Sequence, residues 1–149
     1  MKLIFAEDDR YLDQMVKFQL AMALETEDFK LNEEKLRLGI KTQIGRNQTG
    51  RYLLALDGEE LVGMLLTLFE WSDWRGREVI WIHSVYIDPK YRGQGIYRKM
   101  YSHVKELVEQ NEKYAGIRLY VDKSNTDAQK VYEKLGMSDE HYLMYEWLK

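Results

Sequence analysis

The spacing of apolar residues near the N-terminus predicts one strand followed by two helices. A short apolar run predicts the strand over residues 2–7. Asp8 or Asp9 is then expected to cap a helix. The inner stripe of this helix carries Leu12, Met15, Val16, Gln19 and Leu20. A second amphipathic helix is predicted over residues 32–44.

The middle of the chain has the pattern of strands. Residues 52–56 and 60–70 flank the dipeptide Asp57-Gly58, which is typical of a two-residue hairpin turn. Residues 78–87 are rich in β-branched and aromatic side chains and stop at Asp88-Pro89, as a strand does at a turn. These segments therefore predict antiparallel strands.

Helical spacing returns after residue 95, and strands alternate with helices from there on. A helix is predicted from the stripe Ile96, Met100, Val104, Leu107 and Val108. Residues 116–121 read as a strand, residues 125–136 as a helix that stops at Gly136, and residues 137–148 as the last strand or strands. The element order predicts an α/β fold, a mixed sheet with helices on both faces, as a single domain over residues 1–149.

Composition narrows the class of protein. The chain has 149 residues, 45% of them hydrophobic, which is enough for a proper core. It has no cysteine, which excludes thiol catalysis and disulfides, and its net charge of −3 argues against nonspecific nucleic-acid binding. The longest apolar run, residues 61–69, is too short to cross a bilayer, and Glu7 interrupts any signal peptide, so the cytoplasm is expected.

The sequence from Tyr91 to Met100, YRGQGIYRKM, places two glycines and several cations at the start of a predicted helix. A helix N-terminus has unpaired N–H groups and the positive end of the helix dipole, and Gly93 and Gly95 let a ligand approach the backbone. No acidic residue lies between Asp88 and Glu106. These features predict a site for a diphosphate.

Two common glycine motifs do not fit this stretch. A dinucleotide fingerprint needs a third glycine where Arg98 stands, and a phosphate-binding Walker loop needs Gly-Lys-Ser/Thr. The stretch instead resembles motif A of the GCN5-related N-acetyltransferases (GNAT), whose backbone amides hold the pyrophosphate of acetyl-CoA. The matching residues are Arg92, Gly93, Gln94, Gly95 and Ile96, with Tyr97 in place of the usual Gly or Ala and Arg98 adding charge.

A second block resembles motif B of the same family. Residues 125–136, NTDAQKVYEKLG, begin with Asn125 in a capping position and carry Tyr132 where that motif has its tyrosine, while Met137 replaces the usual Phe. The resemblance implies an acyl-CoA N-acyltransferase fold with acetyl-CoA as cosubstrate. It implies a backbone-lined slot at Val85, Tyr86 and Ile87, a contact of Asn125 with the cofactor site, and a thiolate-protonating role for Tyr132. The alternative for Tyr132 is a core position on the apolar stripe of its helix.

The proton acceptor is less clearly indicated. An amine of lysine-like pKa, near ~10.4, must lose a proton before its nitrogen attacks a thioester. His83 lies on the fourth predicted strand, and an imidazole of pKa near ~6.5 suits this relay, although a lone strand histidine is also a common structural residue. No His/Asp/Glu set has the spacing of metal ligands, so no metal is expected.

The acceptor is predicted from charge. The segment between the first two helices, LETEDFKLNEE, carries five acids against one lysine, which would attract a cationic amine. Glu25 and Glu27 are expected to hold it, and Trp71 and Trp74 to form an apolar or cation–π wall, although a run of acids is also an ordinary solvated face.

The sequence therefore favours an N-acetyltransferase that acts on a small cationic amine by direct attack of the amine on the thioester. Two alternatives stay open: a non-catalytic acyl-CoA-binding module of the same fold, and an acetyltransferase of protein lysines or N-termini. No membrane or nucleic-acid partner is expected. Dimers are common in the family, so a homodimer is among the expected states.

Overall fold

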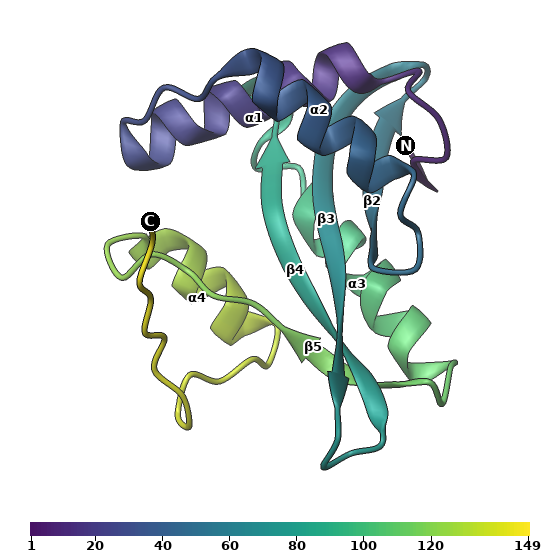
Figure 1. Ribbon diagram of the computed structural model, residues 1–149, viewed down its shortest axis with the longest axis vertical. Coiled ribbons are helices and arrows are strands. Elements are labelled where there is room, and N and C mark those ends of the chain that lie inside the picture. The colour runs from purple at the N-terminus through teal and green to yellow at the C-terminus, as the bar shows by residue number, and fades with distance from the viewer. The chain divides into compact units, whose positions relative to one another are not determined.

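The sheet is an antiparallel meander extended by one parallel strand. The computed structural model describes all 149 residues. β1 (Lys2–Phe5), β2 (Gly50–Asp57), β3 (Glu60–Ser72) and β4 (Arg77–Ile87) pair antiparallel in chain order, and β5 (Tyr114–Arg118) joins β4 in parallel (Figure 1). A parallel pair needs a crossover, which here contains the helix α3 (Ile96–Glu109). The predicted mixed sheet is confirmed.

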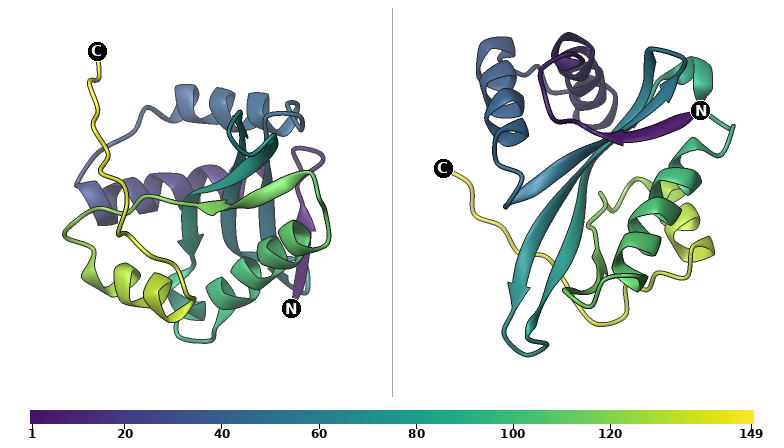
Figure 2. Two further views of the ribbon diagram at one scale, coloured as in Figure 1. Left: turned by 90° about the horizontal axis from the view of Figure 1, so that it is seen from below. Right: turned by 90° about the vertical axis from the view of Figure 1, so that its right-hand side faces the viewer.

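Two helices, α1 (Leu12–Glu27) and α2 (Glu33–Ile44), cover one face of this sheet (Figure 2). Their apolar stripes meet alternate residues of the strands, as a period of two along a strand requires. The shared core contains Leu12, Met15, Val16, Ile40, Ile44, Tyr52, Leu54, Leu56, Met64 and Tyr86. The expected helices are confirmed, but the expected cap of the first is wrong: its N-cap is Tyr11, while the Asp8 carboxylate accepts the Arg10 amide in the preceding turn.

The helix α3 lies on the opposite face of the sheet (Figure 2). Ile96, Met100 and Val104 recur every four residues along it and are buried. Because helices cover both faces, the interior strand β2 is buried from Tyr52 to Leu56, which explains its continuous apolar run.

The chain divides into two compact units, Met1–Arg118 and Leu119–Lys149. In the second unit α4 (Thr126–Lys134) begins at Asn125, whose side chain accepts the Ala128 amide. It is followed by Gly136 at φ 82°, a left-handed conformation that favours glycine. The prediction of a single domain stays a prediction. No helix in the chain combines the length and apolar character that crossing a bilayer requires.

The expected last strand over residues 137–148 is wrong. This segment has no regular secondary structure, and the preceding strand ends at Arg118 instead of residue 121. The apolar residues at its end are exposed: Tyr142, Leu143, Met144, Tyr145, Trp147 and Leu148. Four of them are consecutive, so the sequence lacks the strict alternation of a half-buried strand, and no neighbouring ladder satisfies the segment's backbone groups.

Candidate functional site

The glycine turn between the short 3-10 helix Pro89–Tyr91 and α3 is open to solvent. Gly93 has φ 77° and Gly95 has φ 74°, a backbone region in which side chains are strained. A Cβ atom added to either glycine would meet no other atom within 4 Å. These glycines are therefore required by the backbone conformation, and the space above them is available to a ligand.

The start of α3 presents a set of unsatisfied donors. The first hydrogen bond of the helix runs from the Lys99 amide to the Gly95 carbonyl, and α3 has no side-chain cap. The amides of Gly93, Gln94, Gly95 and Ile96 donate to no protein atom. No acid lies in the first turn of the helix, so these amides and the helix dipole favour an anion such as a diphosphate.

Tyr97, which departs from the family motif, packs along the helix. Its ring lies 6.3 Å from the ring of Tyr101, one turn further on, at a tilted angle. The side chain is half-buried, whereas Arg98 is exposed. The tyrosine is therefore compatible with an open turn.

The β4 strand extends beyond its parallel neighbour. β5 pairs with β4 only from Glu78 to Trp81, and β4 continues to Ile87 (Figure 1). The predicted slot residues Val85, Tyr86 and Ile87 lie in this extension, immediately before the glycine turn. A strand edge past the end of its ladder offers backbone donors and acceptors to an extended ligand.

A bulge interrupts β4 at the start of the slot. Leu66 pairs with His83 and Met64 with Tyr86, so Leu65 faces two residues, Ser84 and Val85. Ser84 has φ 51°, an uncommon conformation for a residue other than glycine. Such backbone strain is found at sites where a side chain or carbonyl must be redirected.

His83 faces the α1 and α2 side of the sheet. Tyr52, Leu66 and His83 form one row across β2, β3 and β4, and residues directly opposite each other share a face. The imidazole stacks on Trp81 at 6.1 Å. Burial lowers the pKa of His83, which keeps the imidazole neutral at pH 7 and able to accept a proton.

Arg92, which directly precedes the glycine turn, contacts α1 and β4. Its Nη2 donates to Glu25 Oε2 at 2.8 Å, its Nε donates to the Ile87 carbonyl at 2.9 Å, and its guanidinium lies 5.3 Å from the ring centre of Tyr86. The Tyr86 hydroxyl donates to Glu25 Oε1 at 3.2 Å. Burial and then the Glu25 carboxylate raise the pKa of Tyr86.

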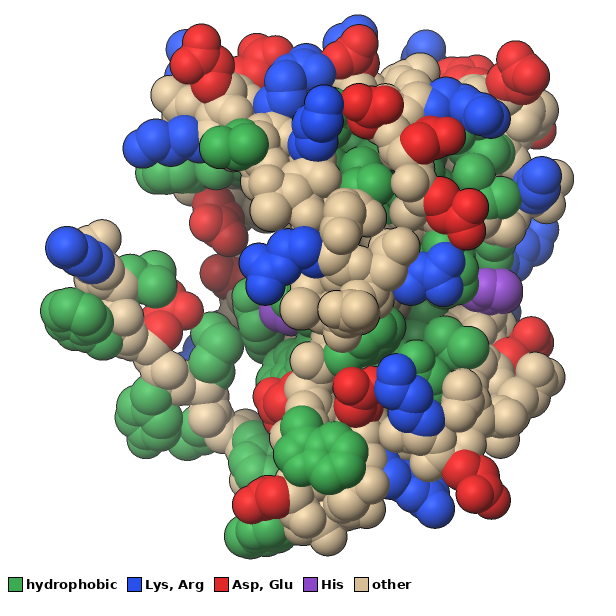
Figure 3. Space-filling view, turned by 45° about the vertical axis from the view of Figure 1, so that its right-hand side comes forward, with side chains coloured by type: hydrophobic (Ala, Val, Ile, Leu, Met, Phe, Trp, Pro, Cys, Tyr) green, Lys and Arg blue, Asp and Glu red, His purple; other side chains and the backbone are tan.

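The predicted acceptor residues are not brought together. Glu25 binds Arg92 near the end of β4, beside Tyr86. Trp71 pairs with Glu78 near the start of β4. Glu78 lies eight residues before Tyr86, so these two ends of β4 are about 26 Å apart at ~3.3 Å per residue. Trp74 lies in the β3–β4 turn and is 90% exposed, and Glu27 is exposed at the end of α1. On the face drawn in Figure 3, acidic and basic side chains are interspersed over the α1 and α2 end of the molecule.

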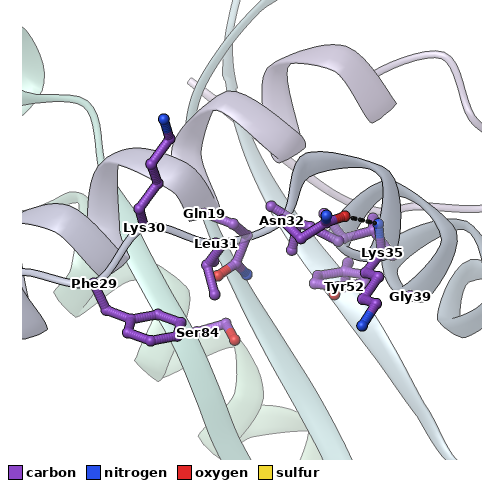
Figure 4. Close-up of a pocket in the computed structure, with 11 residues that line it drawn as sticks. Gln19, Phe29, Lys30, Leu31, Asn32, Lys35, Gly39, Tyr52 and Ser84 are labelled. Carbon is purple, nitrogen blue, oxygen red and sulfur yellow. Dashed lines mark hydrogen bonds between the residues drawn. The ribbon is translucent and has the colours of Figure 1, made fainter.

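A cavity of about 650 Å³ lies between α1, α2 and the sheet (Figure 4). Its walls come from α1, the segment between the two helices, α2, β2 and the β4 bulge. The lining includes Gln19, Phe29, Leu31, Lys35, Tyr52 and Ser84. Because Ser84 directly precedes Val85, the cavity opens next to the slot residues of β4.

Gln19 and Tyr52 are polar groups that the packing leaves available to the cavity. They are 6% and 5% exposed, and neither the Gln19 amide nor the Tyr52 hydroxyl makes a hydrogen bond within the protein. Burial raises the pKa of Tyr52 to about 12, so its hydroxyl stays protonated at neutral pH. Buried polar groups are normally satisfied, which makes these two groups candidates for ligand contact.

The sequence pattern did not indicate that these residues line a cavity. Gln19 had a signal, because it is a polar residue within an otherwise apolar helical stripe, but a polar position on a stripe does not by itself indicate a ligand. Tyr52 and Ser84 had no such signal in the sequence, because strand pairing and the β4 bulge bring them to the cavity.

The motif B residues lie in the second unit. The Asn125 side chain caps α4, a structural role that does not depend on a cofactor. Tyr132 is half-buried on this helix, and burial raises the pKa of Tyr132 above its usual value. The hydroxyl is therefore protonated at neutral pH and able to donate a proton or a hydrogen bond.

No three His, Asp or Glu side chains are grouped so that they could hold a metal ion. Of the other histidines, His103 packs against Phe5 at 5.9 Å in α3, and His141 is exposed near the C-terminus.

Comparison with known proteins agrees with this geometry. Residues 16–137 match the family model described as the acetyltransferase (GNAT) family. A thialysine N-epsilon-acetyltransferase from Bos taurus is 33% identical over 124 residues, which cover 76% of this chain and 69% of that protein.

Two solved structures extend the comparison. A possible acetyltransferase from Clostridium difficile 630 superposes with a TM-score of 0.93 at 34% identity, covering 99% of this chain and 97% of that one. A predicted acetyltransferase from Clostridium acetobutylicum, solved with acetyl-CoA, has a TM-score of 0.76 at 17% identity over 97% of this chain and 95% of that one, a likeness of fold alone.

Proposed function

The chain belongs to the acetyltransferase (GNAT) family of acetyl-CoA-dependent N-acetyltransferases, and from this premise we propose that it acetylates the primary amine of a small molecule bound in the cavity. The observation that carries the proposal is the adjacency of three features on one short stretch of chain. The cavity reaches Ser84, the β4 extension follows at Val85–Ile87, and the open amides of the glycine turn begin at Gly93.

The residues present fit acetyl-CoA. The amides of Gly93, Gln94, Gly95 and Ile96 would hold its pyrophosphate, with Arg98 adding positive charge, and the edge of β4 at Val85–Ile87 would hold its pantetheine arm. When bound, acetyl-CoA supplies an activated acetyl group as a thioester. A β4 amide near Ile87 would donate to the carbonyl oxygen as negative charge develops on it.

Protons move in two places during the transfer. The acceptor ammonium must lose a proton before its nitrogen forms the new C–N bond, and His83, neutral and on the cavity side of the sheet, would receive that proton directly or through water. The C–S bond breaks in the same transfer, and the Tyr132 hydroxyl would give a proton to the departing sulfur. This role of Tyr132 rests on its match to motif B.

The volume of the cavity suits a small acceptor. A volume of about 650 Å³ is within the ~300–1,000 Å³ of small-molecule sites. The named activity of the bovine relative is acetylation of an amino acid amine, which supports a small amine here. A non-catalytic acyl-CoA-binding module would need neither this cavity nor a neutral imidazole on the same face of the sheet.

A thiol-release assay with acetyl-CoA and a panel of primary amines tests the proposal. We expect turnover with at least one small amine, and we expect acetyl-CoA to raise the melting temperature by mass action. Tyr132→Phe should lower kcat on the order of 10²-fold while the melting-temperature rise with acetyl-CoA is kept.

Tyr145→Phe is the matched control, because Tyr145 is 90% exposed in the same unit. It should leave kcat unchanged. A chain that is stabilised by acetyl-CoA but releases no thiol with any amine would instead be a binding module.

A further inference from the structure

The two ends of the cavity differ in charge and in the elements beside them. Figure 4 shows Ser84 beside Phe29 at one end, and Lys35 beside Tyr52 at the other. The Ser84 end adjoins the β4 slot, where the proposed acetyl transfer takes place. The Lys35 end lies beside Tyr52 of β2, and β3 separates β2 from β4, so this end is the one farther from the slot.

Positive charge lines this cavity and negative charge does not. Lys30 and Lys35 are among the lining residues, and no Asp or Glu is. Neither lysine ammonium lies within 4.0 Å of a carboxylate, although four other lysines of the chain form such ion pairs. Lys30 extends away from the other lining side chains, so Lys35 is the cation best placed for a ligand (Figure 4).

Two acids of the neighbouring segment are paired with arginines outside the cavity. Glu25 Oε2 lies 2.8 Å from Arg92 Nη2, and Glu33 Oε1 lies 3.7 Å from Nη2 of Arg37 on the same helix. The acid-rich segment between α1 and α2 therefore does not make the cavity itself acidic, and the start of α2 adds the positive end of its dipole.

We infer that the acceptor carries an anionic group, most simply a carboxylate, which Lys35 binds at the far end of the cavity with hydrogen bonds from Tyr52 and Gln19. This inference rests on the proposed function, because it takes the Ser84 end as the place of the reacting amine. Lys35 would be a specificity-determining residue. The acceptor would then be an amino acid or a related amino carboxylate and not a polyamine.

The spacing of the strands sets the length of this acceptor. Tyr52 on β2 and Ser84 on β4 are separated by two inter-strand steps, on the order of 10 Å. The amine and the carboxylate must therefore be separated by several bonds. The apolar wall of Phe29, Leu31, Leu36 and Ile40 suits an aliphatic chain between them.

Matched amines that differ only in the carboxylate test the inference. The pairs are L-lysine with cadaverine, L-ornithine with putrescine, and β-alanine with ethylamine, each measured by thiol release at saturating acetyl-CoA and low salt. We expect kcat/KM to favour the carboxylate member by on the order of tenfold or more, with the largest value for a long pair.

Lys35→Gln should remove this preference by raising KM for the carboxylate member, with kcat and the kinetics of its partner amine little changed. Lys17→Gln is the control, because Lys17 is an exposed α1 lysine outside the cavity. Equal or better use of cadaverine than of L-lysine by the native chain would overturn the inference, as would an equal loss in Lys17→Gln.

A binding measurement separates this inference from the proposed function. The melting temperature is measured with CoA and either L-lysine or cadaverine, which requires no turnover. Greater stabilisation by L-lysine that Lys35→Gln abolishes supports the anion site even if no amine is acetylated. Acetylation of both amines without a Lys35-dependent difference would keep the function and remove the anion site. Stabilisation by neither compound would also overturn the anion site.

Discussion

At the scale of single residues, the site depends on side chains whose protonation equilibria burial shifts further toward the neutral form. Burial lowers the pKa of His83, so that the imidazole is neutral where a proton must be accepted. Burial raises the pKa of Tyr52 to about 12, so that its hydroxyl remains a donor. Desolvation disfavours the charged form in both cases, and the two residues lie in one cross-strand row.

The lowered pKa of His83 predicts a loss of stability in acid. The unfolded chain has the higher histidine pKa, near ~6.5, so as the pH falls through that value it binds the proton first and the free energy of unfolding decreases. Above that pH both states are neutral and the contribution is constant. We expect the native chain to lose more stability than His83→Gln between about pH 8 and about pH 5, measured as urea midpoints.

His141→Gln serves as the comparison for this measurement, because His141 is exposed near the C-terminus. It should follow the pH dependence of the native chain. If His83→Gln does so as well, then the burial of His83 has no effect on its protonation.

At the scale of elements, the glycine turn and the first turn of α3 act as one unit. The left-handed conformations of Gly93 and Gly95 aim successive amides to one side, and the helix that follows adds its dipole. At the other end of the site, the β4 bulge places Ser84 at the cavity. The residues that follow it, Val85–Ile87, lie beyond the β5 ladder.

Gly95→Glu should abolish acetyl-CoA binding, because it places a carboxylate and side-chain bulk among the amides that bind the pyrophosphate. The measurement is the melting-temperature rise with millimolar acetyl-CoA. Gly76→Glu is a matched control: Gly76 has φ 60°, also has open space around its Cβ position, and lies in the β3–β4 turn. It carries the same strain and charge, so equal loss of binding in both variants would mean that general destabilisation is the cause.

At the scale of the whole molecule, helices pack on both faces of the sheet in the first unit. The cavity lies between the sheet and the two helices α1 and α2. α1 and α2 pack on the sheet through core residues that include Met15, Val16, Ile40 and Ile44, and Gln19 and Tyr52 line the cavity. The core beneath this face therefore sets the position of the site.

Leu54→Ala should lower the free energy of unfolding by about 2–5 kcal/mol, because Leu54 is fully buried in that core and its removal leaves a void. Urea denaturation gives the value. Leu38→Ala in α2 makes the same chemical change at a side chain that is 67% exposed, and should stay within ~0.5 kcal/mol of the native chain. Comparable losses in both variants would contradict this position of the core.

The sequence by itself determined the elements and the phosphate-binding chemistry, because both depend on residues close together in the chain. The β-branched run of β4, the stripe of α3 and the glycines at 93 and 95 each specify their local conformation, and the family resemblance follows from them. The expected terminal strand was wrong because a strand needs a neighbouring ladder, which local pattern cannot supply.

Only the tertiary structure decided which distant residues share a site. Strand register joined Tyr52 to His83, the bulge brought Ser84 to the cavity, and an ion pair joined Glu25 of α1 to Arg92. Register also placed Trp71 at the opposite end of β4 from Glu25. Charge counted along the segment between α1 and α2 predicted an acidic rim, yet the charged residues among those that line the cavity are Lys30 and Lys35. The direction in which a side chain points is set by packing, and packing is a property of the folded molecule.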